Sequence, residues 1–207
     1  MRRDTTRIRT KDCEIRLVGV YHRYQPSMVD VEDAIFEERP GIVCVELPPD
    51  DYLKFLEVRS YLETELKVAM ITACDIGSRV FLVDWEKSLM KERLERINGL
   101  GDREVLDRFE DGDIPGFLKL VRERTDCLNE VQEVLIHERD GVIARKISIL
   151  EKRSQDGKIV GIVGHSHLKG VGVFLKHPEK LEEFLDKKEI TVNEPQEVSC
   201  EEIALYR

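Results

Sequence analysis

The sequence has few of the features that mark membrane and secreted proteins. Aromatic residues make up only 6% of its 207 residues, and one tryptophan is present. No stretch reaches the ~18 consecutive apolar residues that a membrane-spanning helix needs. The first residues, 1–4, are basic but lack the apolar stretch of a signal peptide. The sequence therefore predicts a protein with no membrane segment that is located in the cytoplasm.

Negative charge outnumbers positive charge in the sequence. The chain has 33 lysines and arginines against 42 aspartates and glutamates, a formal net charge of -9. Nonspecific binding to nucleic acid depends on basic patches that neutralise phosphates, so we expect no nucleic-acid partner. The partner that we expect is a peptide or small-molecule substrate, and a homo-oligomer is compatible with the composition.

Several sequence motifs of known chemistry are missing. There is no Cys-x-x-Cys spacing, so neither a zinc ribbon nor a local redox pair is indicated. The phosphate-loop pattern, a Gly-x-Gly-x-x-Gly after the first expected strand and a Gly-x-Ser-x-Gly elbow are also absent. Nucleotide binding and acyl-serine chemistry therefore lack support. The five cysteines are Cys13, Cys44, Cys74, Cys127 and Cys200.

Apolar runs alternate with helical patterns along the chain. The pattern predicts strands at 14–20, 41–47, 79–84 and 158–163, with a weak last strand at 204–206. It predicts helices at 29–38, 48–74 and 86–97, a helix or helix pair at 117–153, and two helical stretches that divide near residue 178. This order indicates one α/β domain over 1–207, with a largely parallel or mixed central sheet and helices on both faces. A helical insertion is expected at about 99–153, before the last core strand.

Two Gly-x-x-His segments end expected core strands, one from Gly19 to His22 and the other from Gly164 to His167. Ligands of open α/β sheets bind beyond the carboxyl ends of the strands. Glycine can adopt positive φ and lets backbone or ligand approach closely, so both glycines are predicted to adjoin the bound group. The two segments therefore predict two corners of one polar site.

Carboxylates lie at the ends of two further expected strands. Glu46 lies inside an apolar run, where an unpaired charge is costly, so it should have a cation, a metal or a donor network. Asp84 directly precedes the helix expected from 86, which favours a role as its N-cap. Imidazole and carboxylate side chains together suit a divalent metal or proton transfer. The alternative is purely structural, with each residue capping a helix or binding a loop amide.

A glutamate also lies on the apolar stripe of the long helix expected before the last core strand. Glu138 is three residues after Leu135 and four before Val142, and Arg139 and Arg145 lie nearby. A buried glutamate either forms an ion pair with arginine that locks the helix to the sheet or takes part in catalysis. The other apolar residues of the stripe are Leu128, Val131 and Ile149.

Four blocks of the chain resemble the TraB/PrgY family, which is related to the GumN and Tiki proteins and to erythromycin esterase-like and ChaN-like proteins. The blocks occur in the family's order and are LVGVYH at 17–22, VCVEL at 43–47, ERD at 138–140 and IVGHSHLKG at 162–170. The chain departs from the family where an arginine commonly follows Glu-Leu and where Asp-Arg commonly ends the third strand, since it has Pro48 and Trp85 there. Without these two arginines, the family's usual contact to an anionic substrate is in doubt.

The resemblance implies a metal-dependent peptidase or hydrolase of amides or esters. It implies that His22, Glu46 and His167 hold a divalent metal such as Mn, Co or Zn, which would lower the pKa of bound water. It also implies catalytic roles for Glu46 or Glu138 as general base, with Arg139 and His165 beside them. Two alternatives are a metal-free form in which a histidine activates water and a module that binds or signals through a peptide without cutting it. The second is suggested by pheromone shutdown in the TraB group.

Overall fold

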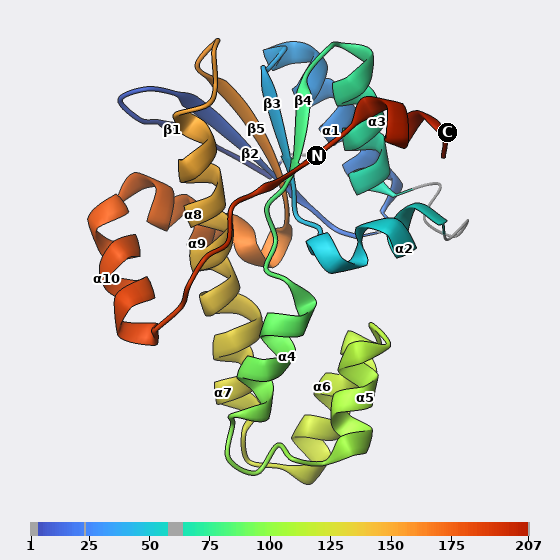
Figure 1. Ribbon diagram of the computed structural model, residues 1–207, viewed down its shortest axis with the longest axis vertical. Helices are drawn as coiled ribbons and strands as arrows, with labels where there is room; N and C mark the ends of the chain where they lie inside the picture. The colour runs from blue at the N-terminus through green and yellow to red at the C-terminus, as the bar shows by residue number, and fades with distance from the viewer. Residues whose placement is uncertain (1–3, 23, 58–63, 207) are drawn as a thin grey trace.

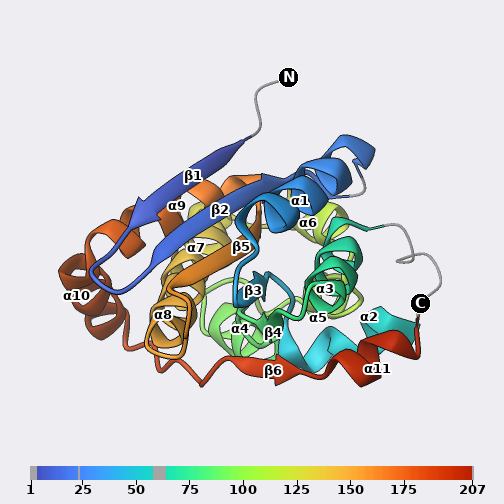
Figure 2. The same ribbon diagram turned by 90° about the horizontal axis from the view of Figure 1, so that it is seen from above.

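A computed structural model describes residues 4–22, 24–57 and 64–206. Within them one sheet has the order β1-β2-β5-β3-β4-β6 (Figures 1 and 2). The pairs β2–β5, β5–β3 and β3–β4 are parallel, whereas β1 and β6 are antiparallel edge strands. This confirms the predicted α/β fold with a mixed, mostly parallel sheet. The strands are β1 (Thr5–Arg9), β2 (Glu14–Val20), β3 (Ile42–Val45), β4 (Arg79–Leu82), β5 (Lys158–Gly164) and β6 (Gln196–Val198).

The parallel strands form because they are short, apolar and covered on both faces. Every residue of β3 is buried, as is every residue of β5 after Lys158. Such runs suit a sheet with helices on both sides, where no strand face meets water. The edge strand β1 was not predicted, because its sequence TTRIR has one buried side chain, that of Ile8.

Helices cover both faces of the sheet. On one face α1 (Gln25–Glu38) and α3 (Glu65–Asp75) pack against the strands through residues such as Ile35 and Met70. On the other face lie α8 (Arg139–Glu151), α9 (His165–Lys176) and α10 (Pro178–Lys188), which share a second apolar core. Figure 2 shows α3 and α8 on opposite sides of the central strands. The predicted break near Pro178 is confirmed, since α10 begins there.

A helical extension projects beyond the sheet (Figure 1). Its helices share a third apolar core that includes Leu94, Phe109 and Phe117. A π-helical turn, η3 (Glu133–Glu138), joins this extension to α8. The part of the expected helical insertion before residue 117 contains α5 and the start of α6. The helices are α4 (Lys87–Glu95), α5 (Arg103–Glu110), α6 (Ile114–Arg124) and α7 (Leu128–Gln132).

Two sequence predictions for the helices and strands are wrong. The single helix expected at 48–74 is instead η1 (Pro49–Asp51), α2 (Tyr52–Glu57) and α3, with residues 58–63 outside the described part. Thr64 is the N-cap of α3, because its side chain accepts a hydrogen bond from the Lys67 backbone N–H. A separate helix therefore begins at this point. The strand expected at 204–206 is also wrong, because Ser199 caps the helix α11 (Cys200–Ala204) at that end of the chain.

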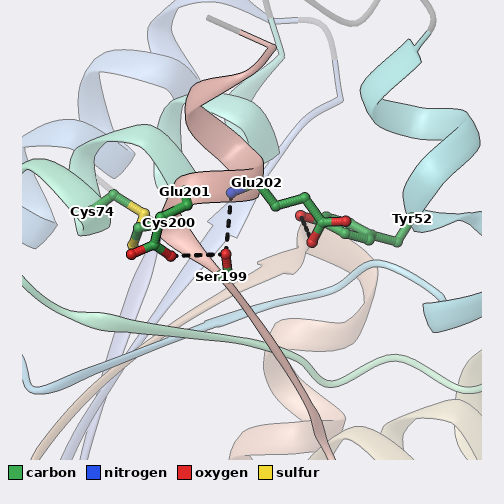
Figure 3. The surroundings of a disulfide bond; sticks show 6 residues. All are labelled: Tyr52, Cys74, Ser199, Cys200, Glu201 and Glu202. Atoms are coloured by element: carbon green, nitrogen blue, oxygen red, sulfur yellow. Dashed lines mark hydrogen bonds between the residues drawn. A yellow bond between two sulfur atoms is a disulfide. The ribbon is translucent and has the colours of Figure 1, made fainter.

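A disulfide joins the end of α3 to the start of α11 (Figure 3). Cys74 and Cys200 are 126 residues apart in sequence, with Cα atoms separated by 5.6 Å. Cysteine spacing did not predict this bond, because spacing rules detect only pairs that are local in sequence. Glu202 on α11 also accepts a hydrogen bond from the Tyr52 hydroxyl at 3.3 Å. Burial raises the pKa of Tyr52, and the nearby Glu202 raises it further. The carboxyl-terminal helix is therefore attached to the domain at two points.

None of the helices in the described part of the chain is both long enough and apolar enough to cross a membrane.

Candidate functional site

The carboxyl ends of the parallel strands meet at a cavity of about 480 Å³. Strand β5 lies between β2 and β3, so the residues after β2 and β3 flank the end of β5. The cavity is bordered on this side by His22, Glu46, Asp84, Arg139 and His167. A ligand pocket of an α/β sheet is expected at this edge.

Gly164 is the point at which three predicted site residues converge. A Cβ atom added to Gly164 would lie 3.5 Å from His22 Nε2, Glu46 Oε2 and His167 Cδ2. The Gly164 backbone N–H also donates a hydrogen bond of 2.5 Å to Glu46 Oε2. The structure therefore brings His22, Glu46 and His167 together around one backbone atom.

Neither glycine of the Gly-x-x-His segments has a positive φ. Gly164 has a φ of -54°, and among the described glycines those with positive φ are Gly77, Gly99, Gly112 and Gly157. Gly19 lies away from the site, where an added Cβ would approach Leu168 Cδ2 to 2.9 Å. Gly19 thus permits close packing of α9 on the sheet, whereas Gly164 opens space for the site.

Two buried carboxylates share one guanidinium. Arg139 Nη2 donates to Glu46 Oε1 at 2.9 Å and to Asp84 Oδ2 at 2.7 Å, and its Nε donates to Asp84 Oδ1 at 2.9 Å. Burial acts to lower the pKa of Arg139, but the charges of Asp84 and Glu46 raise it overall. Arg139 is therefore the cation that Glu46 was predicted to need.

The N-cap role predicted for Asp84 is wrong. The α4 backbone N–H groups of Lys87 and Ser88 instead donate to the carboxylate of Asp50, each at 2.9 Å. Asp84 is fully buried, and Lys146, also fully buried, donates from Nζ to the Asp84 carbonyl at 2.7 Å. Asp84 thus binds Arg139 through its carboxylate, and its backbone holds the helix α8 against the sheet through Lys146.

His22 forms a pair with a carboxylate that the sequence reading missed. Its Nδ1 lies 2.5 Å from Glu65 Oε1, in the first turn of α3. The bond to Glu65 raises the pKa of His22. The stabilisation from this pair is therefore present below the ordinary histidine pKa of about 6.5 and is lost as pH rises through the raised value. An acidic residue in a first helical turn is common, so the sequence carried no specific signal for Glu65.

His167 is held by a second carboxylate. Its Nδ1 lies 2.7 Å from Asp140 Oδ1, and its Nε2 lies 3.7 Å from Glu46 Oε1. Burial raises the pKa of Asp140, although the bond to His167 acts to lower it. Asp140 was part of the Glu-Arg-Asp block but was not predicted as a site residue. Both imidazoles of the site are thus oriented through Nδ1 by a carboxylate from a helix.

Close approach of α9 to α8 depends on Gly170. A Cβ at Gly170 would lie 1.8 Å from Asp140 Oδ2, which no adjustment of a few tenths of an ångström relieves. We expect Gly170→Ala to displace Asp140 and to lower the free energy of unfolding by roughly 1–3 kcal/mol, as overpacking does. Urea unfolding followed by circular dichroism measures this change.

Gly172→Ala is the matched control on the same helix. Its added Cβ would lie 3.6 Å from Thr6 Cγ2, an ordinary contact. Alanine favours a helix over glycine by about 1 kcal/mol, so Gly172→Ala should be neutral or stabilising. Equal effects of the two substitutions would contradict the contact between Gly170 and Asp140.

Glu138 and His165, both predicted as catalytic, lie outside the cavity. Glu138 accepts hydrogen bonds from Arg93 Nε at 2.9 Å and Nη2 at 3.2 Å, and it borders a separate cavity. His165 stacks on Tyr21 with ring centroids 4.6 Å apart and lies 3.3 Å from Asp4. The geometry of Glu138 is that of a buried ion pair, with Arg93 as a partner in place of Arg139 or Arg145.

The predicted metal ligands do not form a complete set in this arrangement. Among the described residues, no group of three or more histidines, cysteines, aspartates and glutamates is placed to hold a metal ion. Both oxygens of Glu46 already accept hydrogen bonds, one from Arg139 and one from Gly164. A metal ion bound by Glu46 would share its two oxygens with these donors.

No protein-family model matches the chain, and no curated protein is significantly similar to it. The resemblance to the TraB/PrgY family therefore stays a prediction from the four sequence blocks.

Proposed function

We propose that the chain is a hydrolase that cleaves an amide or ester bond in a peptide or similar substrate, with His22 as general base. The observation that carries the proposal is the His22–Glu65 pair, in which the Nδ1 contact leaves Nε2 beside Gly164. A carboxylate on one imidazole nitrogen and a free second nitrogen at a cavity is the arrangement of a general-base histidine.

The chemistry follows from these positions. His22 Nε2 accepts a proton from water, and the water oxygen attacks the carbonyl carbon of the substrate. Negative charge develops on the carbonyl oxygen as the tetrahedral intermediate forms. The intermediate then collapses, the bond to the leaving nitrogen or oxygen breaks, and His22 returns the proton to that atom. Glu65 stabilises the imidazolium between the two steps.

A metal-dependent form of this hydrolase is the second candidate. Both His22 and His167 contact a carboxylate through Nδ1, and metal-binding histidines commonly have such partners. Against it stands the bonding of Glu46 to Arg139 and Gly164. The two forms differ in their response to chelator and to added Mn²⁺, Co²⁺ or Zn²⁺.

The test measures cleavage of a peptide library and of p-nitrophenyl esters, before and after dialysis against EDTA. We expect the wild-type protein to cleave without added metal and His22→Gln to lose activity by about 10²–10⁴-fold, the usual contribution of a general base. His177→Gln is the matched control, because His177 is 47% exposed and lies outside the cavity. Activity lost with EDTA and restored by one metal would favour the metal-dependent form.

The pH dependence separates catalysis from a structural role of the pair. Because Glu65 raises the pKa of His22, kcat/KM should rise with pH through an inflection above about 6.5. Glu65→Gln should move that inflection to lower pH. Peptides that bind but are recovered intact by mass spectrometry would overturn the hydrolase and support the non-catalytic binding module.

A further inference from the structure

The cavity has a second wall of different chemistry, opposite the strand ends. Helices of the extension supply it, and its apolar side chains come from four elements. They are Met90 of α4, Phe109 of α5, Ile114 and Leu118 of α6, and Leu135 and Ile136 of η3. A polar cluster facing an apolar wall is the usual composition of a pocket for a small organic ligand.

Helix α6 contributes apolar side chains to this wall in addition to those that it buries fully in the core of the extension. Phe117 and Val121, four residues apart, are fully buried in the core of the extension. Ile114 and Leu118 form a second apolar pair at the same spacing on another side of α6, where both border the cavity. Ile114 remains 36% exposed and Leu118 is half-buried. Leu118 also packs against the core of the extension, whereas Ile114 is left largely uncovered, so α6 presents apolar surface to the cavity.

The charges around the cavity disfavour an anionic ligand. Three carboxylates border it, those of Glu46, Asp51 and Asp84, against two permanent cations. Both cations are paired, Arg139 with Glu46 and Asp84 and Lys87 with Asp51 at 3.3 Å. A carboxylate or phosphate on the ligand would meet a negative potential and two cations that are already neutralised.

We propose that this apolar wall binds an uncharged aliphatic group of the substrate, next to the bond that His22 attacks. This assignment of the substrate class rests on the proposed function. The aliphatic group lies along Leu118 and Ile114 while the carbonyl lies at Gly164. The same wall excludes chains that end in a carboxylate.

The binding test uses N-alkyl acetamides from methyl to hexyl, with affinities measured by isothermal titration calorimetry. Each methylene buried on the wall should tighten binding roughly fourfold. Leu118→Asp should remove this dependence on chain length. Leu53→Asp is the matched control, because Leu53 is 57% exposed on α2 and is not part of the cavity lining. Circular dichroism establishes that both variants fold.

Ester hydrolysis gives an independent readout. We expect kcat/KM to be higher for p-nitrophenyl hexanoate than for p-nitrophenyl acetate. It should also be at least tenfold higher for the hexanoate than for the mono-p-nitrophenyl ester of adipic acid, which ends in a carboxylate. Hexyl-dependent binding that is lost in Leu118→Asp, without any ester or peptide cleavage, would support the wall and overturn the hydrolase. Cleavage of all esters at equal rates would overturn the proposed role of the apolar wall while the hydrolase stands. Binding that Leu118→Asp leaves unchanged would also overturn that role.

Discussion

Substitution of Arg139 by methionine is expected to lower the free energy of unfolding by about 3–5 kcal/mol, the usual cost of removing one partner from a buried ion pair. Arg139 is the shared cation of Glu46 and Asp84, whose side chains are 3% and 0% exposed. Without it two buried carboxylates are left without the cation that they share. Methionine keeps most of the volume of the side chain, so the effect reports on charge and hydrogen bonding.

Arg145→Met is the matched control for this prediction. Arg145 lies on the same helix but is 39% exposed, and its partner Glu182 is 53% exposed. Exposed pairs contribute about 0–1 kcal/mol, so this variant should unfold near the wild-type denaturant midpoint. Similar losses in the two variants, measured by urea titration, would show that the buried triad is not held by Arg139. Wild-type stability of Arg139→Met would likewise show that Arg139 does not stabilise Glu46 and Asp84.

Loss of the Cys74–Cys200 disulfide is expected to cost about 2–5 kcal/mol. The bond closes a segment in which the two cysteines are 126 residues apart, so in the chain-entropy account it strongly restricts the unfolded state. The double variant Cys74→Ala/Cys200→Ala should therefore unfold at lower urea concentration than the oxidised wild-type protein.

Reductant provides the control within this experiment. Dithiothreitol should destabilise the wild-type protein and leave the double variant unchanged, because the remaining cysteines, Cys13, Cys44 and Cys127, are free thiols. Thiol titration of the unfolded, unreduced wild-type protein should detect these three thiols. Detection of all five would contradict the bond. Disulfides persist mainly in oxidising compartments, so detection of only three thiols would count against the predicted cytoplasmic location.

The core of the fold was predictable because its strands carry a strong local signal. Apolar runs located β2, β3, β4 and β5 and placed His22, Glu46, Asp84 and His167 at their ends. The strand order was not predictable, because the pairing of β5 between β2 and β3 depends on contacts distant in sequence. The edge strand β6 and the helix α11 were not predicted, since three paired residues and a serine N-cap give weak patterns.

The partners of the site residues were harder to predict than the residues themselves. Glu65 and Asp140 lie on helices, and the sequence around them does not indicate that each pairs with a histidine. Glu138 was placed on the apolar stripe and is buried, but its partner Arg93 is 45 residues away on α4. Local periodicity indicates that a side chain faces inward, whereas the identity of its partner is decided by how distant helices cross.

The π-helical turn η3 makes the length of one segment critical. Glu138 at its end belongs to one cavity, while the next two residues, Arg139 and Asp140, hold Glu46 and His167 in the other. One residue corresponds to about 100° of rotation in an α-helix. An insertion or deletion in the loop before α7 or in the loop after α8 would leave these directions unchanged, but one inside 133–138 would turn both side chains away from the site. During divergence this segment should tolerate substitutions far better than changes in length.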